Sequence, residues 1–265
     1  MDLTSYDWIV INTSAGKDSQ AMLDLVVGMA KTLNILDRVV AVHCDLGQVE
    51  WQGTKELAAE QCTHYGIPLH IVRREKGDLL QQVEERGMWP DNKNRYCTSD
   101  QKRDQVAKVI TSLVNSFVEK MTKNTRPVRV LNCMGLRAEE SATRAKKVPF
   151  QVNKRLTNGK REVFDWLPIH TWTVQQVWAC IKASSVKYHF AYDLGMPRLS
   201  CCFCIFASEG ALMIAGKHNP ELLSKYVRVE KSTGHDFRHR FKIASIQARL
   251  NAGEQPPATV ASWNM

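Results

Sequence analysis

The chain has 265 residues with a formal net charge of +9, and 44% of its residues are hydrophobic. This length can bury the core of one large domain, or of a domain with a smaller lobe. No apolar run approaches the roughly 20 residues that span a bilayer, and residues 1–7 lack the basic and apolar regions of a signal peptide. We therefore expect a cytoplasmic protein without a membrane partner.

Charge is distributed unevenly along the chain. Residues 1–92 carry 8 Lys and Arg against 14 Asp and Glu, a net charge of −6, which leaves 28 against 13 and a net charge of +15 for residues 93–265. This excess is larger than a nucleotide pocket needs, so it predicts a polyanionic partner, most plausibly nucleic acid. A merely basic soluble surface would give the same count.

The first elements have the pattern of strand, turn and helix. Residues 8–11 form a short apolar run, residues 12–17 are polar with one glycine, and apolar residues recur at helical spacing over residues 20–29. Asp18 and Ser19 are good residues with which to start a helix. This order aims backbone amides and a helix dipole at one spot, so it predicts an anion site. An ordinary strand-to-helix turn would have the same pattern.

Strands and helices then alternate. Further strands are predicted over residues 39–43, 69–73 and 126–134, and helices over residues 50–65, 79–86 and 100–121. Alternation of this kind predicts a parallel sheet with helices on both faces and with ligands bound at the carboxyl ends of the strands. The polar loops that follow strands there are residues 13–19, 45–47 and 135–144.

The pattern loosens after residue 146. Residues 146–161 are basic and contain Asn158-Gly159, a good hairpin turn. Helices are predicted over residues 174–183, after a cap at Thr171 or Thr173, and over residues 209–216, 220–230 and 236–250, while residues 188–206 are irregular. We expect a nucleotide-binding α/β domain over residues 1–170 and a basic helical lobe over residues 171–265 packed on it.

The eight cysteines fall into two groups, and without an export signal a disulfide framework is not expected. Cys44, Cys62, Cys133 and Cys180 lie in apolar or helical stretches, where cysteine behaves as a small hydrophobic residue. Cys97, Cys201, Cys202 and Cys204 lie in turn-like stretches, and Cys201 and Cys204 form a Cys-x-x-Cys pair. Such pairs are common in zinc and iron–sulfur sites.

Five segments share the motifs of one known superfamily. They are Ser14-Ala-Gly-Lys-Asp-Ser19, Asp45-Leu-Gly47, Arg95-Tyr-Cys-Thr-Ser-Asp-Gln-Lys102, Gly135-Leu-Arg-Ala-Glu-Glu-Ser-Ala-Thr-Arg144 and Leu167-Pro-Ile-His-Thr-Trp172. In order and spacing they resemble the PP-loop ATP pyrophosphatases, in the branch of proteins similar to phosphoadenosine-phosphosulfate reductase. Two positions depart from the family pattern, with alanine for a glycine at Ala15 and leucine for a threonine at Leu46. The resemblance implies a Rossmann-like parallel sheet of the adenine nucleotide α-hydrolase type. It also implies an enzyme that cleaves ATP between its α and β phosphates.

The resemblance also implies roles for single residues. The implied ATP site comprises Ser14, Ala15, Gly16, Lys17, Asp18, Ser19, Asp45, Gly47, Gly135 and Arg137. Lys17, Asp18 and Arg137 would be catalytic, because two cations can neutralise the leaving pyrophosphate and a carboxylate can hold Mg²⁺; the alternative for Asp18 is a helix cap. Lys102 and Arg144 would hold a substrate phosphate, unless they are surface charges.

The cysteines bear on the choice of subfamily. Sulfonucleotide reductases of this branch use a cysteine in a C-terminal Glu-Cys-Gly motif, and no cysteine follows Cys204 in this sequence. The resemblance therefore favours relatives that insert sulfur, several of which hold a [4Fe–4S] cluster or carry persulfides. Three roles are open to the motif cysteines Cys97, Cys201, Cys202 and Cys204. They could be ligands of an iron–sulfur cluster, with zinc a less favoured metal. They could instead form a sulfur relay, or be passive buried thiols.

Within this branch the sequence most resembles the ATP pyrophosphatase subunits of DNA phosphorothioation systems, of the Dnd and Ssp types. That resemblance implies adenylation of a DNA backbone phosphate before sulfur insertion. A cysteine desulfurase would donate the sulfur, and other subunits of the modification complex would be partners. The alternatives are thiolation of a tRNA base, a reductase-like oxidoreductase, and a nucleic-acid-binding module that a nucleotide only switches.

Overall fold

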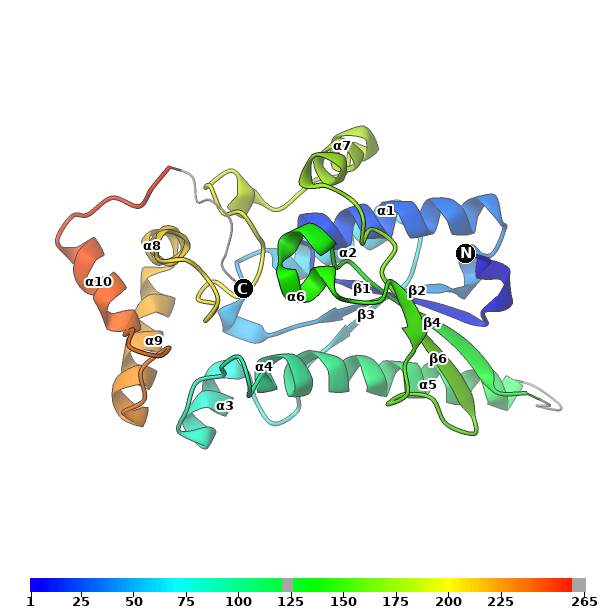
Figure 1. Cartoon of the computed structure of the whole chain (residues 1–265), viewed down its shortest axis with the longest axis horizontal. Coiled ribbons are helices and arrows are strands. Elements are labelled where there is room, and N and C mark those ends of the chain that lie inside the picture. The colour runs from blue at the N-terminus through cyan, green and yellow to red at the C-terminus, as the bar shows by residue number, and fades with distance from the viewer. Residues whose placement is uncertain (121–125, 259–265) are drawn as a thin grey trace. The chain divides into compact units, whose positions relative to one another are not determined.

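The protein has the α/β fold that its sequence predicts. A computed structural model describes residues 1–120 and 126–258, and its strands form one sheet in the order β3-β2-β1-β4-β6-β5 (Figure 1). Their bounds are β1 Trp8–Thr13, β2 Val39–Cys44, β3 Leu69–Val72, β4 Val128–Met134, β5 Phe150–Val152 and β6 Arg161–Trp166. Neighbouring strands pair in parallel, except that β5 runs antiparallel to β6. The sheet is thus of the Rossmann-like, mostly parallel type.

Helices cover both faces of this sheet (Figure 1). Ile9 and Ile11 of β1 contribute to the core beneath α1 (Lys17–Thr32), α2 (Thr54–Tyr65) and α7 (Val174–Ser184). Val10 contributes to the core beneath α5 (Asp104–Lys120) on the other face. Alternate residues of a strand point to opposite faces, which is why a strand buried on both sides reads as a continuous apolar run. Among the described residues, no helix has both the length and the apolar character needed to cross a membrane.

The chain divides into two compact units made of interleaved segments. The first unit contains residues 1–44, 53–72 and 104–189, and so holds the whole sheet. The second contains residues 45–52, 73–103 and 190–265. This division differs from the predicted boundary after residue 170, because α7 packs against α1 and stays with the sheet.

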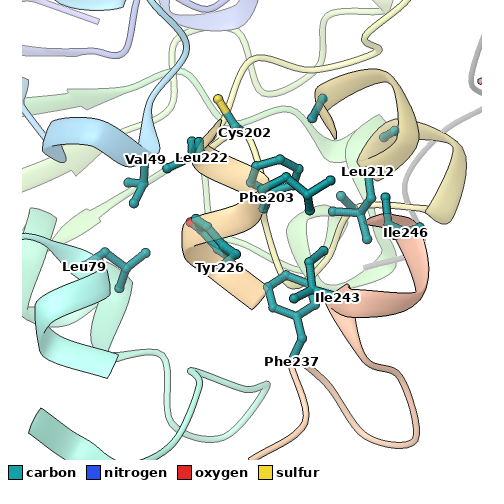
Figure 2. Packing of buried hydrophobic residues seen from close by; sticks show 14 of the residues in the cluster. Val49, Leu79, Cys202, Phe203, Leu212, Leu222, Tyr226, Phe237, Ile243 and Ile246 are labelled. Atoms are coloured by element: carbon teal, nitrogen blue, oxygen red, sulfur yellow. The ribbon is translucent and has the colours of Figure 1, made fainter. Parts of the chain in front are cut away.

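The second unit has an apolar core of its own (Figure 2). Its helices are α3 Leu79–Arg86, α4 Tyr96–Thr98, α8 Glu209–His218, α9 Pro220–Thr233 and α10 Ile243–Asn251. Tyr226 lies at the centre, with its ring stacked on Trp89 at a centroid distance of 5.2 Å and tilted against Phe203 at 5.0 Å. Aromatic side chains bury large areas, so this cluster accounts for much of the unit's stability.

Two predicted helices begin later than the sequence suggests. The helix expected from residue 50 begins at Thr54, because a 3-10 turn occupies Gly47–Val49 and Gly53 adopts a left-handed φ of 81°. The helix expected from residue 236 begins at Ile243. There the buried carboxylate of Glu230 accepts the N–H groups of Phe237, Ile243 and Ala244, which holds the preceding loop out of helical conformation.

Other predicted elements are close to those observed. The helix expected over residues 100–121 is preceded by α4 and a π-helical turn, Ser99–Arg103, and Met121 lies outside the described residues. Thr173 caps α7, as one of the two predicted alternatives, by accepting the Gln176 N–H. The turn at Asn158-Gly159 is confirmed, since Asn158 and Arg161 form an antiparallel bridge around it.

Candidate functional site

The loop between β1 and α1 has the backbone geometry of an anion site. Gly16 precedes the first helical residue in an extended conformation, and no side chain of the described residues caps the helix there. Ala15 has a left-handed φ of 54°, at the position where the superfamily pattern has glycine. The first amides of a helix have no acceptor within it, so this loop presents donors and the positive end of the dipole to an anion.

Two serines hold the loop in this form. The hydroxyl of Ser19 donates to the carbonyl oxygen of Gly16 at 2.9 Å, and the amide of Ser14 donates to the Ser19 hydroxyl at 3.1 Å. Asp18 and Ser19 lie inside the first turn, with Gly16 at the cap position. The alternative that Asp18 serves only as the helix cap is therefore wrong.

Two buried cations meet on the carboxylate of Asp18. The Nε of Arg137 donates to Oδ1 at 2.6 Å, and the Nζ of Lys17 lies 3.3 Å from Oδ2. Lys17 and Arg137 are each only 3% exposed. Burial alone would raise the pKa of Asp18, but the two cations outweigh it and lower that pKa below its ordinary value. Asp18 is therefore ionised at neutral pH and holds both cations at the first turn of α1.

Arg137 also connects three segments of the first unit. Its Nη1 donates to Glu139 at 2.5 Å and to the carbonyl oxygen of Trp172 at 3.3 Å. Glu139 in turn accepts the N–H of Val174, the first residue of α7, at 2.8 Å. One guanidinium therefore links the loop after β4 to the starts of α1 and α7. Sequence reasoning did not single out Glu139, although the motif that contains Arg137 includes it.

Gly135 lies where β4 passes closest to α1. A Cβ atom there would be 2.9 Å from the carbonyl oxygen of Asp18 and 3.0 Å from the amide nitrogen of Ser19. Real Cβ atoms do not approach backbone atoms so closely, and neither neighbour is a flexible side chain. The backbone of residues 13–19, the predicted phosphate loop, thus requires glycine at position 135. The implied role of Gly135 in the ATP site stays a prediction.

The guanidinium of Arg144 already has a carboxylate partner within the first unit. It belongs to α6 (Ala142–Ala145) and forms an ion pair with Glu140. Its carbonyl oxygen lies 3.0 Å from Nε2 of the buried His170. A substrate phosphate would have to compete with Glu140 for this guanidinium, so the predicted role of Arg144 remains a prediction.

Asp45 and Gly47 form a tight turn in the second unit. The Asp45 carboxylate accepts the Gly47 N–H at 2.8 Å, and Gly47 has a left-handed φ of 70°. A Cβ at Gly47 would lie 2.8 Å from the guanidinium of Arg73. These contacts explain why glycine occupies position 47, and the implied role of both residues in the ATP site stays a prediction.

The four motif cysteines also belong to the second unit. Cys202 is fully buried in its apolar core (Figure 2), and its amide donates to the carbonyl oxygen of Val49 at 2.8 Å. Cys97, Cys201 and Cys204 are only partly buried and pack against the same core. Cys202 is therefore buried in the way expected of a passive thiol, the third of the roles considered for the motif cysteines.

The three partly buried thiols interact with one another and with Lys102. Burial raises the pKa of Cys201 and of Cys204 above the ordinary thiol value, and the neighbouring cysteines raise both further. The charge of Lys102, on the π-helical turn that follows α4, acts in the opposite direction. The predicted role of Lys102 at a substrate phosphate stays a prediction, and the structure adds that its charge acts on these thiols.

These side chains do not fit the predicted metal centres. In residues 1–120 and 126–258, no group of three or more His, Cys, Asp or Glu side chains is arranged to hold a metal ion. Both carboxylate oxygens of Asp18 face cations, so Asp18 does not fit as a direct Mg²⁺ ligand in this arrangement.

The sequence from β1 to the last motif cysteine matches one family model. The model of the phosphoadenosine phosphosulfate reductase domain aligns with residues 8–207. The chain belongs to this reductase-domain family. The match confirms the predicted PP-loop superfamily and branch. Closeness to the subunits of DNA phosphorothioation systems stays a prediction.

Three relatives illustrate how far the likeness to this reductase-domain protein extends. An uncharacterized 37.8 kDa protein of Escherichia phage 186 is 26% identical over 164 residues, which are 62% of this chain and 45% of the phage protein. A phosphoadenosine 5'-phosphosulfate reductase of Gloeobacter violaceus is 24% identical over 210 residues, 74% of this chain and 70% of that enzyme. A tRNA-cytidine(32) 2-sulfurtransferase of Saccharophagus degradans is 34% identical over 77 residues, 29% of this chain and 24% of that enzyme. The chain thus spans less than half of the phage protein and about a quarter of the sulfurtransferase.

Sequence reasoning missed one further polar feature of this reductase-domain chain. Asn12 donates to Asn132 at 2.7 Å, Asn132 donates to Asp165 at 2.7 Å, and Asn153 donates to the same carboxylate at 3.0 Å. The row crosses β1, β4 and β6 near their carboxyl ends, and Asn132 and Asp165 are register partners. Polar residues inside otherwise apolar strands were the available signal. The row fixes the strand ends from which the phosphate loop and the Gly135–Arg144 loop start.

Proposed function

We propose that this chain is an ATP pyrophosphatase that adenylates a nucleic-acid phosphate, most plausibly in the DNA backbone, so that sulfur can replace one of its oxygens. The observation that carries the proposal is the pair of buried cations, Lys17 and Arg137, held on Asp18 at the first turn of α1. Two positive charges and a helix N-terminus suit a triphosphate. Membership of a family whose members act on adenosine nucleotides gives the proposal its reaction class.

In the first step a non-bridging oxygen of the substrate phosphate attacks the α-phosphorus of ATP. The bond from that phosphorus to the β-phosphate breaks, and pyrophosphate leaves with the electron pair. Negative charge grows on the leaving group, where Lys17 and the first amides of α1 can stabilise it. Arg137 positions this region, because it ties α1 to the loop after β4. The product is a substrate phosphate activated by AMP.

In the second step sulfur displaces AMP. A cysteine desulfurase would pass a persulfide to one of the partly buried thiols, and its terminal sulfur attacks the activated phosphorus while AMP leaves. A second thiol of the chain then attacks the S–S bond, which leaves sulfur on the phosphorus and a disulfide on the protein for a cellular dithiol to reduce. The electrostatic interactions among Cys97, Cys201 and Cys204 support this relay, and the charge of Lys102 opposes the burial that raises the pKa of Cys201 and Cys204.

Thiolation of a tRNA base is the second candidate. It is favoured by the 34% identity, over 77 residues, to a tRNA-cytidine(32) 2-sulfurtransferase. The same adenylation would then occur on a carbonyl oxygen of the base. Reduction of a sulfonucleotide is a third possibility, because a phosphoadenosine 5'-phosphosulfate reductase is also a relative.

The test is to incubate the purified protein with ATP, a persulfide donor and either DNA or tRNA. Release of AMP and pyrophosphate, with sulfur found on the DNA backbone by nucleoside mass spectrometry, is the expected result. Lys17→Gln should abolish the release, whereas Lys31→Gln, at an exposed position in the last turn of the same helix, should not. ADP as the product, or no ATP cleavage with either nucleic acid, would overturn the proposal. Sulfur on a tRNA base would select the second candidate, and sulfite formed from phosphoadenosine phosphosulfate would select the third.

A further inference from the structure

One edge of the sheet carries a concentrated positive charge that the proposed chemistry does not use. We call residues 146–161 the basic hairpin; they comprise β5, the connection after it and the first residue of β6. The basic hairpin contains six Lys and Arg and no Asp or Glu. A solvated face of mixed sign would not have this composition, so the segment is suited to a polyanion.

Four lysines of the basic hairpin are available to an anionic partner. Lys146, Lys147, Lys154 and Lys160 are exposed, and within the described residues none of them has an ion-pair partner. The two arginines instead attach the hairpin to the body of the unit. Arg155 pairs with Asp104 at 2.9 Å and Arg161 donates to the hydroxyl of Thr111 at 2.6 Å, both on α5. Arg161 also donates to the carbonyl oxygen of Leu156 at 2.6 Å, within the hairpin itself. The lysines thus project from a fixed platform.

An exposed aromatic ring lies between these lysines in the sequence. Phe150 of β5 is 40% exposed and stacks on Phe164 of β6, with the ring planes 1° apart and the centroids separated by 5.6 Å. The guanidinium of Arg129 lies 5.2 Å from the Phe164 centroid. The stack orients Phe150 before any partner arrives, so little side-chain entropy is lost when a planar ligand is bound. Val152 of β5 is 48% exposed, and Val148, which precedes the strand, is 55% exposed.

Exposed aromatic and apolar side chains within a lysine-rich segment are a combination that suits single-stranded nucleic acid. Lysines contact the phosphates, and an aromatic ring accepts a base by stacking, whichever base it is. A second copy of this chain, joined along the β5 edge, fits less well, because the lysines that flank this edge strand would bring like charges together. A duplex fits less well too, because its bases are not open to stacking on Phe150.

We propose that the basic hairpin is a docking surface for single-stranded nucleic acid, with the four lysines on phosphates and a base stacked on Phe150. The inference rests on the proposed function for the choice of nucleic acid as substrate, and it adds where and in what form that substrate is held.

The first test is a salt titration of binding. The probe is a fluorescent 20-nucleotide single strand of mixed sequence, its binding followed by anisotropy between 50 and 200 mM salt without ATP. For single strands the slope of log K against log salt is about −0.7 per phosphate contact. Replacing Lys146, Lys147, Lys154 and Lys160 together by Gln should therefore make the slope shallower by roughly 2.8. The matched control replaces four exposed lysines elsewhere in the same unit, Lys31, Lys55, Lys182 and Lys187, and should leave the slope unchanged.

The second test addresses stacking. Phe150→Ala should weaken binding of the single strand by roughly 5- to 150-fold, the range found for loss of one base–aromatic stack, and Phe150→Trp should restore it. Tyr188→Ala removes a ring of equal exposure, 40%, elsewhere in the unit and should have no effect. Circular dichroism of each variant checks that it is folded. Restored binding by Phe150→Trp would show that the aromatic ring itself is needed, because a misfolded protein would not regain binding.

Several results would overturn the inference. These are an unchanged slope in the four-lysine hairpin variant, an unchanged affinity in Phe150→Ala, tighter binding of a duplex that does not depend on Phe150, or a dimer that dissociates on the same substitution. The assay contains no ATP, so it separates the two proposals. If the hairpin variants bind as the wild type while pyrophosphate is still released, the docking surface is wrong and the function stands. If the single strand binds at the hairpin but ATP is never cleaved, the function is wrong and the docking surface stands.

Discussion

Replacing Gly135 by alanine should damage the phosphate loop specifically. The new Cβ would lie 2.9 Å from the carbonyl oxygen of Asp18 and 3.0 Å from its carbonyl carbon, with backbone atoms on both sides of the contact. Carbon atoms pack at about 3.5 Å or more, so the end of β4 and the first turn of α1 must separate by roughly 0.5 Å. Overpacking of this kind costs about 1–3 kcal/mol in the free energy of unfolding. A misplacement of about 1 Å costs about a hundred-fold in rate, so this one should lower ATP cleavage by roughly ten-fold.

The assay compares Gly135→Ala with Gly28→Ala. Gly28 lies in α1, the helix whose first turn the Gly135 substitution would displace. Gly28 has no atom within 4 Å of an added Cβ and is exposed, so alanine should stabilise α1 there by about 0.5–1 kcal/mol. Urea unfolding gives the stability of each variant, and pyrophosphate release gives the rate. If Gly135→Ala unfolded at the same urea concentration as the wild type and cleaved ATP as fast, the close contact and its role in placing the loop would both be refuted.

Three further predictions concern the acid side of stability, the core of the second unit and the thiols. Burial raises the pKa of Asp18 but its two cations lower it more, so its ionised form stabilises the fold above the unfolded pKa of about 3.9, and that stability is lost as the pH falls through the lower folded pKa. Asp18→Asn should lower the free energy of unfolding at pH 7 by about 3 kcal/mol. It should also make this free energy fall less steeply between pH 7 and pH 2, as measured by urea unfolding; a fall as steep as in the wild type would contradict this. Glu230→Gln should speed hydrogen exchange at the amides of Phe237 and Ile243, because charged acceptors contribute about 1.5–3 kcal/mol, and unchanged protection there would be the contrary result. Replacing Cys201 and Cys204 by Ala should stop sulfur transfer while ATP binding, measured by calorimetry, stays within about two-fold; full transfer by this variant would exclude a sulfur relay.

The parallel sheet could be predicted because its signals are local. Apolar runs such as residues 8–11 and 39–43 are short enough for buried strands, and the polar loops after them lie at the expected ends. The same applies to α3, whose predicted bounds coincide with Leu79–Arg86, since Asp78 and Gly87 mark its two ends by a capping box and a left-handed φ. In both cases the residues that decide the structure are adjacent in the sequence.

What the sequence did not reveal depends on contacts between distant residues. The start of α10 is delayed because Glu230 accepts amide groups up to 14 residues away, and nothing within the predicted helix signals this. The pairing of Asp18 with Arg137 joins residues 119 positions apart. Motif resemblance named both residues, but it could not show that they pair with each other.

The ion pairs at the start of α1 change how ATP binding should be understood. Lys17 and Arg137 are buried, and unpaired buried charges would be costly, so Asp18 and Glu139 neutralise them in the free chain. An incoming phosphate must therefore replace a carboxylate as the partner of at least one cation. A single monovalent anion gains little from such an exchange, because it offers no more charge than the carboxylate that it displaces. A triphosphate offers several charges at once, and the amides of the helix start add to its binding. Under the proposed function, the internal carboxylates thus favour nucleotides over small anions.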